Sequence, residues 1–543
     1  MKKGKHRRAS RLAKTTLTFE DLKRYRWKEV VEMQERKFRA FIRYQIYPNH
    51  PYYRRLFKKH GVDPWNIEKI EDWEKYQLPL IKKVEYRENI RDFVLNPKLA
   101  DEGEKEPAQI IKNQLAYYKV IGHKEFRKKL LRKALKYKFG IGRSEAEKWI
   151  EHHLKWFFLP VQFWFSSGRG TGIPTPVFLS RYDWELMKKT APKIGVLAYE
   201  DLIKQGIPPR PMNLFPYAPH LGFWGVNEGL YEFADFVYRT AAGASLTTEN
   251  LIKIAETFKA NGFAGMPNYI RNRFCRELVR SNVKLPEKKG IVLLAGEKAY
   301  RRVKKDIKDA FAHAGMDVKI VEGYSASEVK IGFAAECSEN GGLHNISPLL
   351  VAFRTVKFTD GRWEFTSPEE GGHVVIFHLD GTGTVFEGYL MGDYVDKIEI
   401  DKCGECGIEG PRLYEISRSS EIETQLKIMG IAETKIKGST VNLTALRNAL
   451  LQLPEIFECQ IVITKENPND PYSMDVLKIY AALASDATVD TAEIVRKITH
   501  VTKTETEVTP KVEILGLEEL IERAGGMKFR EIADLRPTIQ SEK

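Results

Sequence analysis

The chain has 543 residues, 43% of them hydrophobic and 29% charged, which is a globular composition with room for two to four domains. It contains no run of eighteen apolar residues, so we expect no membrane span, and its N-terminus lacks the apolar segment of a secretory signal. These features predict a cytoplasmic protein.

Half of the net charge of +14 lies at the start of the chain, because residues 1–14 contain seven Lys and Arg and no acidic residue. A segment of this composition predicts a basic, disordered arm over residues 1–17. We expect the arm to be solvated rather than to bind a specific nucleic acid. The remaining positive charge suits a polyanionic substrate.

The predicted secondary structure changes character along the chain. Residues 18–155 are predicted to be mostly helical, and from about residue 160 strands and helices alternate. The expected elements are a helix capped by Thr248 that buries Leu251, Ile254, Ala255 and Phe258, a helix from Met266 to Leu278, a strand over 291–295, a helix over 301–314 and a strand over 318–321. Crossovers this short imply a parallel or mixed sheet covered by helices.

The C-terminal part reads as a smaller unit. Residues 350–400 are rich in predicted strands, and the cluster of glycine and cysteine that follows them ends near Arg418. Beyond it we expect helices near 443–453 and 491–502 and strands near 457–464 and 477–484. We therefore predict an α/β protein with a large domain over 18–417 and a small α+β domain over 418–543.

A glycine-rich segment follows a strand-like aromatic run, in the order Phe163-Trp-Phe-Ser-Ser-Gly-Arg-Gly-Thr-Gly-Ile-Pro-Thr175. Backbone N–H groups of such a loop can converge on an anion, and its hydroxyls add donors. The loop is not the P-loop of nucleoside triphosphatases, because no Lys follows Gly172. It predicts a phosphate cradle, with an ordinary surface turn as the alternative.

Two further polar segments follow predicted strands. They are Ala295-Gly296-Glu297 and Gly323-Tyr-Ser-Ala-Ser-Glu328. Ligands of open α/β sheets bind beyond the carboxyl ends of the strands, so we expect these segments and the glycine loop to outline one pocket. A nucleotide would use its phosphate cradle, the Tyr324 ring and a hard cation held by Glu328.

Taken in order, these motifs resemble the adenylate-forming superfamily, and specifically its phenylacetate–CoA ligase-like branch. The resemblance spans roughly residues 45 to 536. Besides the three segments above, it is carried by Pro51-Tyr-Tyr-Arg-Arg-Leu-Phe, Gly265-Met-Pro-Asn-Tyr269, Gly392-Asp393, Pro411-Arg-Leu with Ser417-Arg418, and Gly525-Gly-Met-Lys528-Phe-Arg.

The resemblance implies a ligase that makes an acyl-adenylate from a carboxylic acid and ATP and then passes the acyl group to a thiol, usually that of CoA, after the small mobile domain rotates. Lys528 would bridge the attacking carboxylate and the α-phosphate, Glu328 would hold Mg²⁺, and Asp393 would bind the ribose. The other expected nucleotide-binding residues are Ser166, Ser167, Gly168, Arg169, Gly170, Thr171, Gly172, Glu297, Tyr324, Ser327 and Arg418.

The sequence departs from the family pattern at several of these positions. The glycine loop has one extra residue and Ile173 where the family commonly has Lys, so Arg169 is the candidate replacement cation. Ser325 replaces a glycine, Gly388-Tyr-Leu-Met replaces Arg-Tyr-Arg-Thr, and Ser420-Glu421 replaces the hinge Asp pair. Such differences allow an altered acceptor.

Four residues have the spacing of a metal site. Six residues separate Cys337 from His344, and Cys403 and Cys406 form a Cys-x2-Cys pair. Three thiolates and one imidazole would complete a closed, structural zinc site, and some members of the resembled branch carry zinc. The alternative is a set of unrelated cysteines, as we expect for Cys275 and Cys459, which read as small buried apolar residues.

The substrate is expected to be an aromatic acid, because Phe215, Tyr217, His220, Phe223 and Trp224 fall where the superfamily builds its acyl pocket, although they could equally be core. The expected partners are this acid, ATP and CoA; the oligomeric state is open, with a homodimer among the options. Two alternatives remain: a nucleotidyltransferase that attaches AMP to a deazaflavin coenzyme, and a non-catalytic nucleotide-binding scaffold that docks a partner through the basic arm.

Overall fold

The computed structural model describes most of the chain, and all statements below refer to that part. The described residues are 15–97, 107–166, 175–217, 221–240, 246–296, 299, 301–359, 362–418, 433–436, 439–469, 473–484, 490–506, 508–526 and 529–536.

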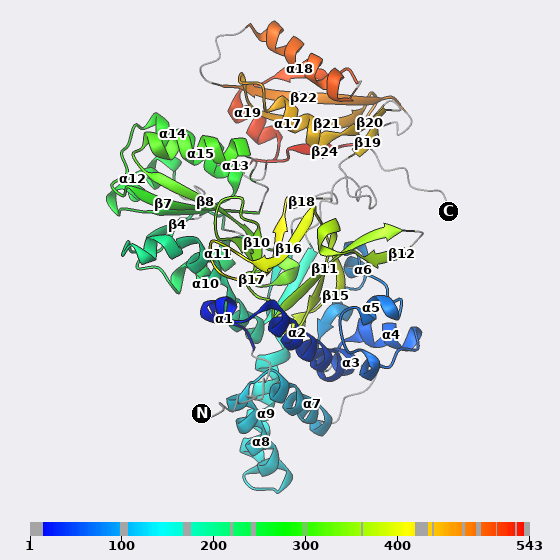
Figure 1. Ribbon diagram of the computed structural model, residues 1–543. Coiled ribbons are helices and arrows are strands. Elements are labelled where there is room, and N and C mark those ends of the chain that lie inside the picture. Colours follow the sequence, from blue (N-terminus) through cyan, green and yellow to red (C-terminus); the bar gives the residue numbers. More distant parts are fainter. Residues whose placement is uncertain are drawn as a thin grey trace, which may run out of the picture.

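The first part of the chain is helical, as predicted, and its last helix ends at Phe158. The helices are α1 (Phe19–Arg24), α2 (Trp27–Phe41), η1 (Ile42–Ile46), α3 (Tyr47–Asn49), α4 (Pro51–Lys59), η2 (Pro64–Asn66), α5 (Asp72–Lys75), α6 (Lys83–Glu88), η3 (Ile90–Phe93), α7 (Pro107–Val120), α8 (Lys124–Lys138) and α9 (Arg143–Phe158). Helices α7, α8 and α9 form a unit that projects from the body at the lower end of Figure 1. We call residues 107–158 the helical projection.

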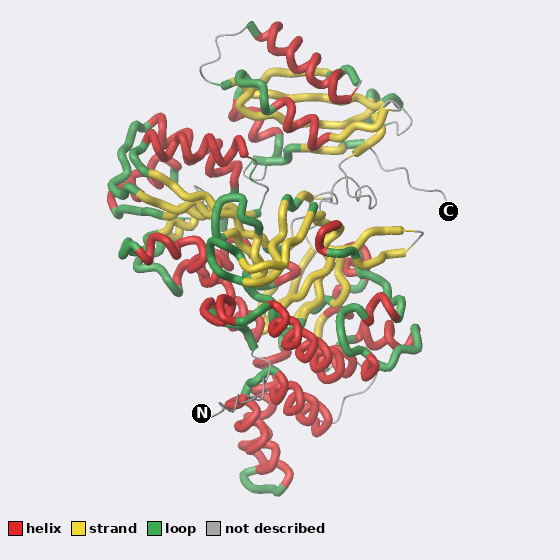
Figure 2. The backbone as a smooth tube through the Cα atoms, in the orientation of Figure 1, coloured by secondary structure: helices red, strands yellow, loops and turns green. Residues whose placement is uncertain are grey.

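A nine-stranded mixed sheet forms the centre of the large domain, as the alternation of strands and helices predicted (Figure 2). Its order is β16 (Lys397–Lys402), β17 (Glu409–Tyr414), β10 (Leu343–Asn345), β9 (Ala334–Glu336), β8 (Asp317–Tyr324), β7 (Lys289–Ala295), β6 (Gly262–Gly265), β4 (Pro211–Asn213) and β5 (Tyr238–Arg239). The last five strands of this order are parallel, and the first four pair in antiparallel fashion. The carboxyl ends of the parallel strands therefore meet at one edge, where a ligand site is expected.

Helices cover the parallel strands on both faces (Figure 1). They are α10 (Arg181–Lys204) and α11 (Leu221–Tyr231) on one face and α12 (Thr248–Thr257), α13 (Pro267–Tyr269), η5 (Ile270–Cys275), α14 (Arg276–Arg280) and α15 (Arg301–His313) on the other. Helices α10 and α11 cross closely, because a Cβ atom added to Gly229 would lie 2.9 Å from the carbonyl oxygen of Ala191. A side chain at Gly229 would push the two helices apart.

A five-stranded antiparallel sheet packs beside the nine-stranded one. Its order is β12 (Arg362–Phe365), β11 (Val351–Thr359), β13 (Gly372–His378), β15 (Glu387–Val395) and β18 (Ser417–Arg418). The smaller pieces of the large domain are β1 (Val94–Leu95) paired with β14 (Gly383–Thr384), the hairpin of β2 (Pro160–Ser166) and β3 (Thr175–Ser180), and the short helices η6 (Ser327–Val329) and η7 (Pro368–Glu370). The glycine-rich segment connects β2 to β3, and residues 167–174 lie outside the described residues.

The C-terminal unit is a separate α+β layer above the large domain (Figure 1). It contains β19 (Glu433–Ile436), β20 (Ser439–Asn442), α17 (Leu443–Leu450), β21 (Ile456–Lys465), β22 (Asp475–Leu483), α18 (Thr491–Thr506), β23 (Lys511–Ile514), α19 (Leu517–Arg523) and β24 (Ile532–Asp534). Its main sheet has the order β23-β22-β21-β24. The predicted helices and strands of this region are confirmed; the domain boundary at Arg418 stays a prediction, because residues 419–432 are not described.

The structure corrects the predicted helix near residue 250. Thr247 rather than Thr248 is the N-cap of α12, since its side chain accepts a hydrogen bond from the N–H of Asn250. Leu251 and Ala255 are buried as expected, but Phe258 lies just beyond the helix and is 52% exposed. A π-helical turn, η5, interrupts the predicted helix that starts after Met266.

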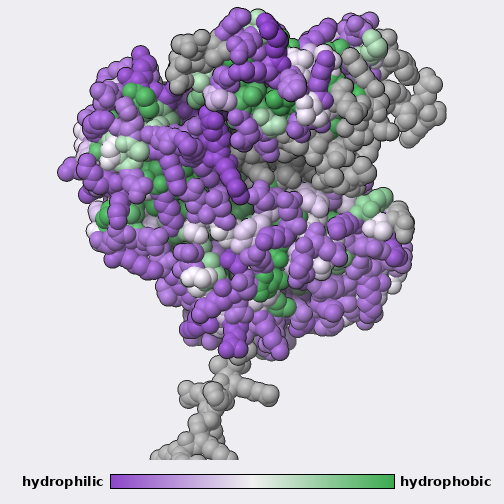
Figure 3. All heavy atoms as spheres, turned by 45° about the horizontal axis from the view of Figure 1, so that its top comes forward, coloured by the Kyte–Doolittle hydropathy of each residue, from purple (hydrophilic) through white to green (hydrophobic). Residues whose placement is uncertain are grey.

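The surface seen in Figure 3 is largely hydrophilic, and its apolar residues form small separate patches. None of the described helices combines the length and apolar character needed to cross a lipid bilayer.

Candidate functional site

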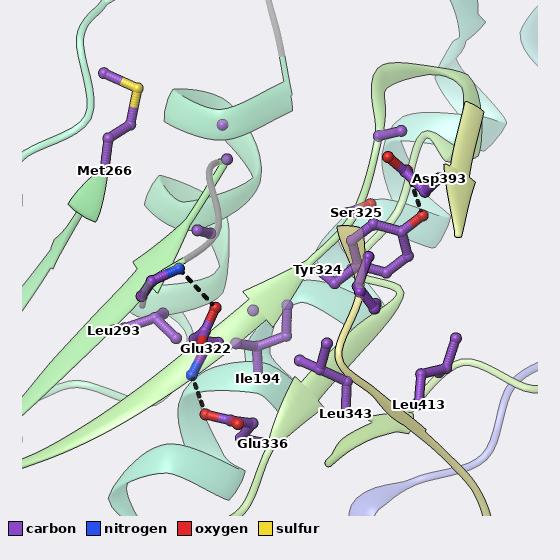
Figure 4. Close-up of a pocket in the computed structure, with 18 of the residues that line it drawn as sticks. Ile194, Met266, Leu293, Glu322, Tyr324, Ser325, Glu336, Leu343, Asp393 and Leu413 are labelled. Carbon is purple, nitrogen blue, oxygen red and sulfur yellow. Dashed lines mark hydrogen bonds between the residues drawn. The ribbon is translucent and has the colours of Figure 1, made fainter. Parts of the chain in front are cut away.

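A cavity of about 650 Å³ lies at the carboxyl ends of the parallel strands. Met266 follows β6, Gly296 follows β7, and Gly323 and Tyr324 end β8, and all four line the cavity (Figure 4). The volume is typical of sites for small molecules and cofactors. This confirms the expectation that the segments after β7 and β8 meet at one pocket.

Tyr324 and Asp393 join the two large sheets at the cavity. The hydroxyl of Tyr324, at the end of β8, donates a hydrogen bond of 2.7 Å to Oδ2 of Asp393 in β15 (Figure 4). Asp393 is buried and lies beside Arg418, with which it pairs through the main chain of β15 and β18. A carboxylate held by a neighbouring sheet in this way can accept hydrogen bonds from ligand hydroxyl groups.

Glu328 is held at the cavity wall by a short 3-10 turn, η6. Its side chain is buried, with Oε1 at 3.3 Å from Nζ of Lys83 and 3.4 Å from the hydroxyl of Tyr389. Lys330, which closes this turn with a φ of 65°, is buried and donates to Oδ1 of Asp183 over 2.9 Å. The turn is therefore fixed from behind by an ion pair to α10.

A group of charged residues forms another part of the cavity wall. Nζ of Lys304 lies 2.7 Å from Oε1 of Glu322 and 3.6 Å from Oε2 of Glu336, and it donates to Asn340 over 3.0 Å. Glu336 also accepts from the backbone N–H of Glu322, and burial raises the pKa of Glu336 to about 7. The wall thus offers carboxylate acceptors close to Tyr324, beside a buried lysine.

The opposite wall is apolar and built from α10 and α11. The residues that α11 presents are Leu221, Gly222, Gly225, Val226, Gly229 and Leu230, and those of α10 are Ala191, Ile194 and Gly195. Both sets recur at helical spacing, so each helix turns one face of small and aliphatic side chains to the cavity.

The predicted aromatic pocket is corrected by this arrangement. Of the predicted aromatic residues, Phe215 lines the cavity, and His220 lies outside the described residues. Tyr217, Phe223 and Trp224 instead pack edge to face against one another, with ring centroids 5.3 to 5.7 Å apart. They do not line the cavity because α11 turns its glycine-rich face to it.

The cavity brings together part of the predicted site. Tyr324, Ser327, Glu328 and Asp393 all line it. Ser166 is the last residue of β2, and Arg418 is the last residue of β18. Ser167, Gly168, Arg169, Gly170, Thr171, Gly172, Glu297 and Lys528 lie outside the described residues.

Several cavity residues were not predicted. Lys83, Glu322 and Glu336 come from positions without a motif, and Asn448 and Gln452 come from or follow α17 of the C-terminal unit. The only signal in the sequence was the position of Glu322, two residues before Tyr324 at the end of a predicted strand. The contribution of α17 follows from how the two units pack, which local sequence does not reveal.

The predicted metal ligands come together at the antiparallel end of the nine-stranded sheet. One ligand atom from each of Cys337, His344, Cys403 and Cys406 lies within 4.8 Å of every other, and all four residues are buried. The sulfurs of Cys337 and Cys403 are 3.7 Å apart, and Sγ of Cys406 is 3.5 Å from Nε2 of His344. A hydrogen bond from the Cys406 thiol lowers the pKa of the Cys337 thiol, which favours the thiolate form that binds metals.

These distances fit a shared metal ion. Two sulfurs in a disulfide are about 2.05 Å apart, which excludes that bond between Cys337 and Cys403. Tetrahedral zinc, with bonds of about 2.3 Å to sulfur and 2.0 Å to nitrogen, separates two thiolates by about 3.8 Å and a thiolate from an imidazole nitrogen by about 3.5 Å. The four residues can therefore hold a metal ion, which would tie β9, β10 and the β16–β17 turn together.

No family model matches the chain, and no curated protein sequence matches it. Among solved structures, 2-hydroxyisobutyryl-CoA ligase in the postadenylation state with 2-HIB-AMP matches at 19% identity and a TM-score of 0.65, covering 94% of this chain and 90% of that chain. The same ligase in the thioesterification state with 2-HIB-AMP and CoA matches at 19% identity over 93% and 90%, with a TM-score of 0.53.

The chain therefore has the fold of the adenylate-forming enzymes, as its motifs predicted. The match to the postadenylation structure has the higher TM-score of the two.

Proposed function

We propose that this protein is an ATP-dependent acid–thiol ligase, which activates a carboxylic acid as an acyl-adenylate and transfers the acyl group to a thiol. The observation that carries the proposal is the cavity in which Tyr324, Glu328 and Asp393 meet at the ends of β8 and β15. The likeness in fold to 2-hydroxyisobutyryl-CoA ligase supports it. In this proposal the acceptor is CoA, the location is cytoplasmic, and the chain belongs to the phenylacetate–CoA ligase-like branch.

In the first step the acid's carboxylate attacks the α-phosphate of ATP and pyrophosphate leaves. Asp393 would accept hydrogen bonds from the ribose hydroxyls, and Tyr324 would lie against the adenine. Glu328 would hold Mg²⁺, because this ion prefers oxygen ligands such as a carboxylate. The ion would neutralise charge on the phosphates. The mainly apolar wall of α10 and α11 would enclose the acyl group.

The remaining groups of the reaction are proposed from the sequence resemblance. Ser166, Ser167 and the loop from Gly168 to Gly172 would hold the β- and γ-phosphates, with Arg169 as the added cation. Lys528 would stabilise the charge that develops between carboxylate and α-phosphate. Glu297 and Arg418 would complete the nucleotide site.

The identity of the acid is the finer part of the proposal. An aromatic acid fits the branch, and Phe215 offers one aromatic face. The aliphatic and glycine-lined wall of α10 and α11 equally suits a compact branched acid such as the one named in the matched ligase. The two classes are separated by experiment.

Pyrophosphate exchange over a panel of acids tests the adenylation step. We expect ATP–pyrophosphate exchange with one class of acid, and AMP release that then depends on added CoA. Lys528→Ala should lower exchange by several orders of magnitude through loss of a transition-state cation, while Lys305→Ala, an exposed lysine of α15 paired with Asp309, serves as the matched control.

Three results would decide against the ligase. ATP binding without exchange for any acid would favour the scaffold alternative. Transfer of AMP to a deazaflavin coenzyme without CoA would favour the nucleotidyltransferase. Unchanged exchange in Lys528→Ala would refute the role of that lysine.

We also propose that Cys337, His344, Cys403 and Cys406 hold a structural zinc ion. When bound, zinc cross-links the antiparallel strands; the residues here orient it and exclude water, because all four are buried. We expect about one equivalent of zinc per chain, and a lowered melting temperature after chelation or in Cys403→Ser. Cys459→Ala, in the other domain, is the control that should keep its zinc; less than about half an equivalent in the native protein would contradict the proposal.

A further inference from the structure

The positive charge of the chain is concentrated in two segments of the sequence. The helical projection, residues 107–158, contains thirteen Lys and Arg against four Glu, a net charge of +9. Together with the +7 of residues 1–14, this exceeds the +14 of the whole chain, so the rest of the protein is slightly negative. The excess positive charge of the chain therefore comes from these two segments.

Helix α8 of the projection buries one face and leaves the other unpartnered. Leu130 is fully buried, and Phe126 and Ala134 pack against the core. On the opposite face Leu131 and Leu135 are 40% and 46% exposed. The turn after the helix continues this face with Phe139 and Ile141, which are 67% and 63% exposed.

Basic side chains are interleaved with these apolar ones. Lys124, Lys128, Leu131, Leu135 and Lys138 follow one another at spacings of four, three, four and three, which places them on one side of a helix. Lys128, Arg132 and Lys138 make no ion pair within the described part of the chain. Their charges are available to a partner.

The combination of basic and apolar side chains on this face favours an anionic lipid surface over a nucleic acid as the partner. A nucleic acid would use the charges, but it gains little from aliphatic side chains, since its bases are bound by aromatic stacking. An anionic lipid surface uses both features, because aliphatic and aromatic side chains enter the acyl boundary while lysines reach the headgroups. The exposed position of the projection, away from the C-terminal unit in Figure 1, leaves room for a flat surface.

We propose that the exposed face of α8 and the turn over residues 139–142 dock the protein on an anionic lipid bilayer. The docking face consists of Lys128, Leu131, Leu135, Lys138, Phe139 and Ile141. It is separate from the cavity and does not depend on the proposed ligase reaction. Docking would hold the enzyme at a membrane surface without any span across it.

Vesicle flotation of the full-length protein tests the proposal. We expect binding to phosphatidylcholine vesicles that contain phosphatidylserine, little binding to pure phosphatidylcholine, and loss of binding in high salt. The charge-reversed variant Lys128→Glu/Arg132→Glu/Lys138→Glu should bind about 100-fold or more weakly. The variant Leu135→Ser/Phe139→Ser should bind about tenfold more weakly while keeping all charges.

Matched controls keep the result interpretable. Phe236 and Phe258 are 53% and 52% exposed in the other part of the large domain, so Phe236→Ser/Phe258→Ser should bind vesicles like the native protein. All variants should keep their helical circular dichroism, and their activity without vesicles should not change.

Three outcomes would overturn the proposal. The first is equal binding to neutral and anionic vesicles. The second is loss of binding on removal of residues 1–14 with no effect of the α8 variants. The third is tighter binding to double-stranded DNA than to vesicles, with the same losses in the α8 variants.

Discussion

Lys83 is the residue whose role at the site is least visible in the sequence, because it belongs to the helical N-terminal part and contacts Glu328 only in the fold. A cation bound by Glu328 must compete with this ammonium group. We predict that Lys83→Met lowers the Mg²⁺ concentration needed for half-maximal adenylation by roughly two- to fivefold, in keeping with a partly exposed ion pair. Glu328→Gln should raise that concentration.

Titration of pyrophosphate exchange with Mg²⁺ measures both effects. Lys82→Met, on the residue that precedes α6, is the matched control. If Lys83→Met left the Mg²⁺ dependence unchanged while Glu328→Gln raised it, Lys83 would have no part in cation binding.

Asp393 provides the second residue-scale prediction. The proposed ribose contacts are hydrogen bonds to a charged group, each contributing roughly 1.5–3 kcal/mol, so Asp393→Asn should raise the KM for ATP by about tenfold to a hundredfold. Tyr324→Phe removes only the hydrogen bond to Asp393 and should raise it by a smaller factor, about two- to tenfold. Steady-state kinetics at saturating acid measure both. A KM for ATP that is unaffected by Asp393→Asn would remove Asp393 from the nucleotide site.

At this scale the predictable residues were those that follow strands. Tyr324 ends β8, and Ser327 and Glu328 follow it within four residues, so chain order alone brought them to the edge of the sheet. Asp393 was found through a family motif. Glu336 reaches the cavity from strand β9, and Lys83 reaches it from the distant helix α6. No local sequence pattern encodes such long-range contacts.

Within the helical projection, His153 makes the packing of α9 against α7 sensitive to acid. Its ring stacks on Trp149 with centroids 4.9 Å apart, and its Nε2 lies 2.9 Å from the hydroxyl of Tyr118. Burial lowers the pKa of His153 to about 4 from the ordinary 6.5. Between these values the unfolded chain binds a proton that the folded one does not, so the stabilisation is complete above pH 6.5 and is lost as the pH falls towards 4.

We predict that the projection loosens as the pH falls from 6.5 to 4, at a cost of up to about 3 kcal/mol from His153. Amide hydrogen exchange of α7 and α9 measures it. His153→Gln should flatten this pH dependence, and His152→Gln, at an exposed neighbour, should leave it intact. The same acid sensitivity in both variants would contradict the assignment.

Helices and strands could be predicted where the hydrophobic residues of a segment repeat with a single period. The mostly helical character of residues 18–155 is confirmed, and the strands β7 and β8 and the helix α15 match their predicted positions to within a few residues. The start of α12 was missed by one residue because Thr247 and Thr248 are the same residue type, and the cap is Thr247, whose side chain accepts from the N–H of Asn250. The π-helical turn η5 was not predictable, since one extra residue in a helix leaves no periodic signal.

For the whole molecule, η5 supplies the buried contact between the two domains. Arg271 donates from its Nη1 to Oε2 of Glu458 over 2.8 Å, and both side chains are almost fully buried. The guanidinium also lies over the ring of Phe457, 4.2 Å from its centroid. Glu458 also pairs with Arg447 over 2.7 Å, so loss of Arg271 would remove one of the two buried cations that neutralise this carboxylate.

We predict that Arg271→Leu slows adenylate formation more than acyl transfer, because it releases the domain arrangement of this structure, in which the end of α17 reaches the cavity. Single-turnover rates of the two steps, the second begun from preformed adenylate, measure the difference. Arg273→Leu breaks the exposed contact of Arg273 with Glu518 and should have a much smaller effect. Equal slowing of both steps would show that Arg271 acts on stability alone.

The overall architecture could be predicted because eight motifs occurred in the family's order, although no one of them was sufficient. The relation between the domains could not, since it depends on Arg271 and Glu458, which are 187 positions apart and carry no shared pattern. The net charge of the chain was a poor guide to its partners. The sequence gives the amount of charge, but only the fold shows that residues 107–158 form one projecting unit.

The close crossing of α10 and α11 limits how this cavity can change during evolution or redesign. A Cβ atom at Gly229 would meet the main chain of Ala191, and one at Gly195 would lie inside the ring of Phe233, 1.9 Å from its nearest atom. Both glycines face the cavity, yet neither can be exchanged for a larger residue without moving a helix or a ring. New acid specificities in this lineage should therefore arise by substitution at Ile194, Leu221 and Val226, and libraries aimed at these three positions will sample the accessible chemistry.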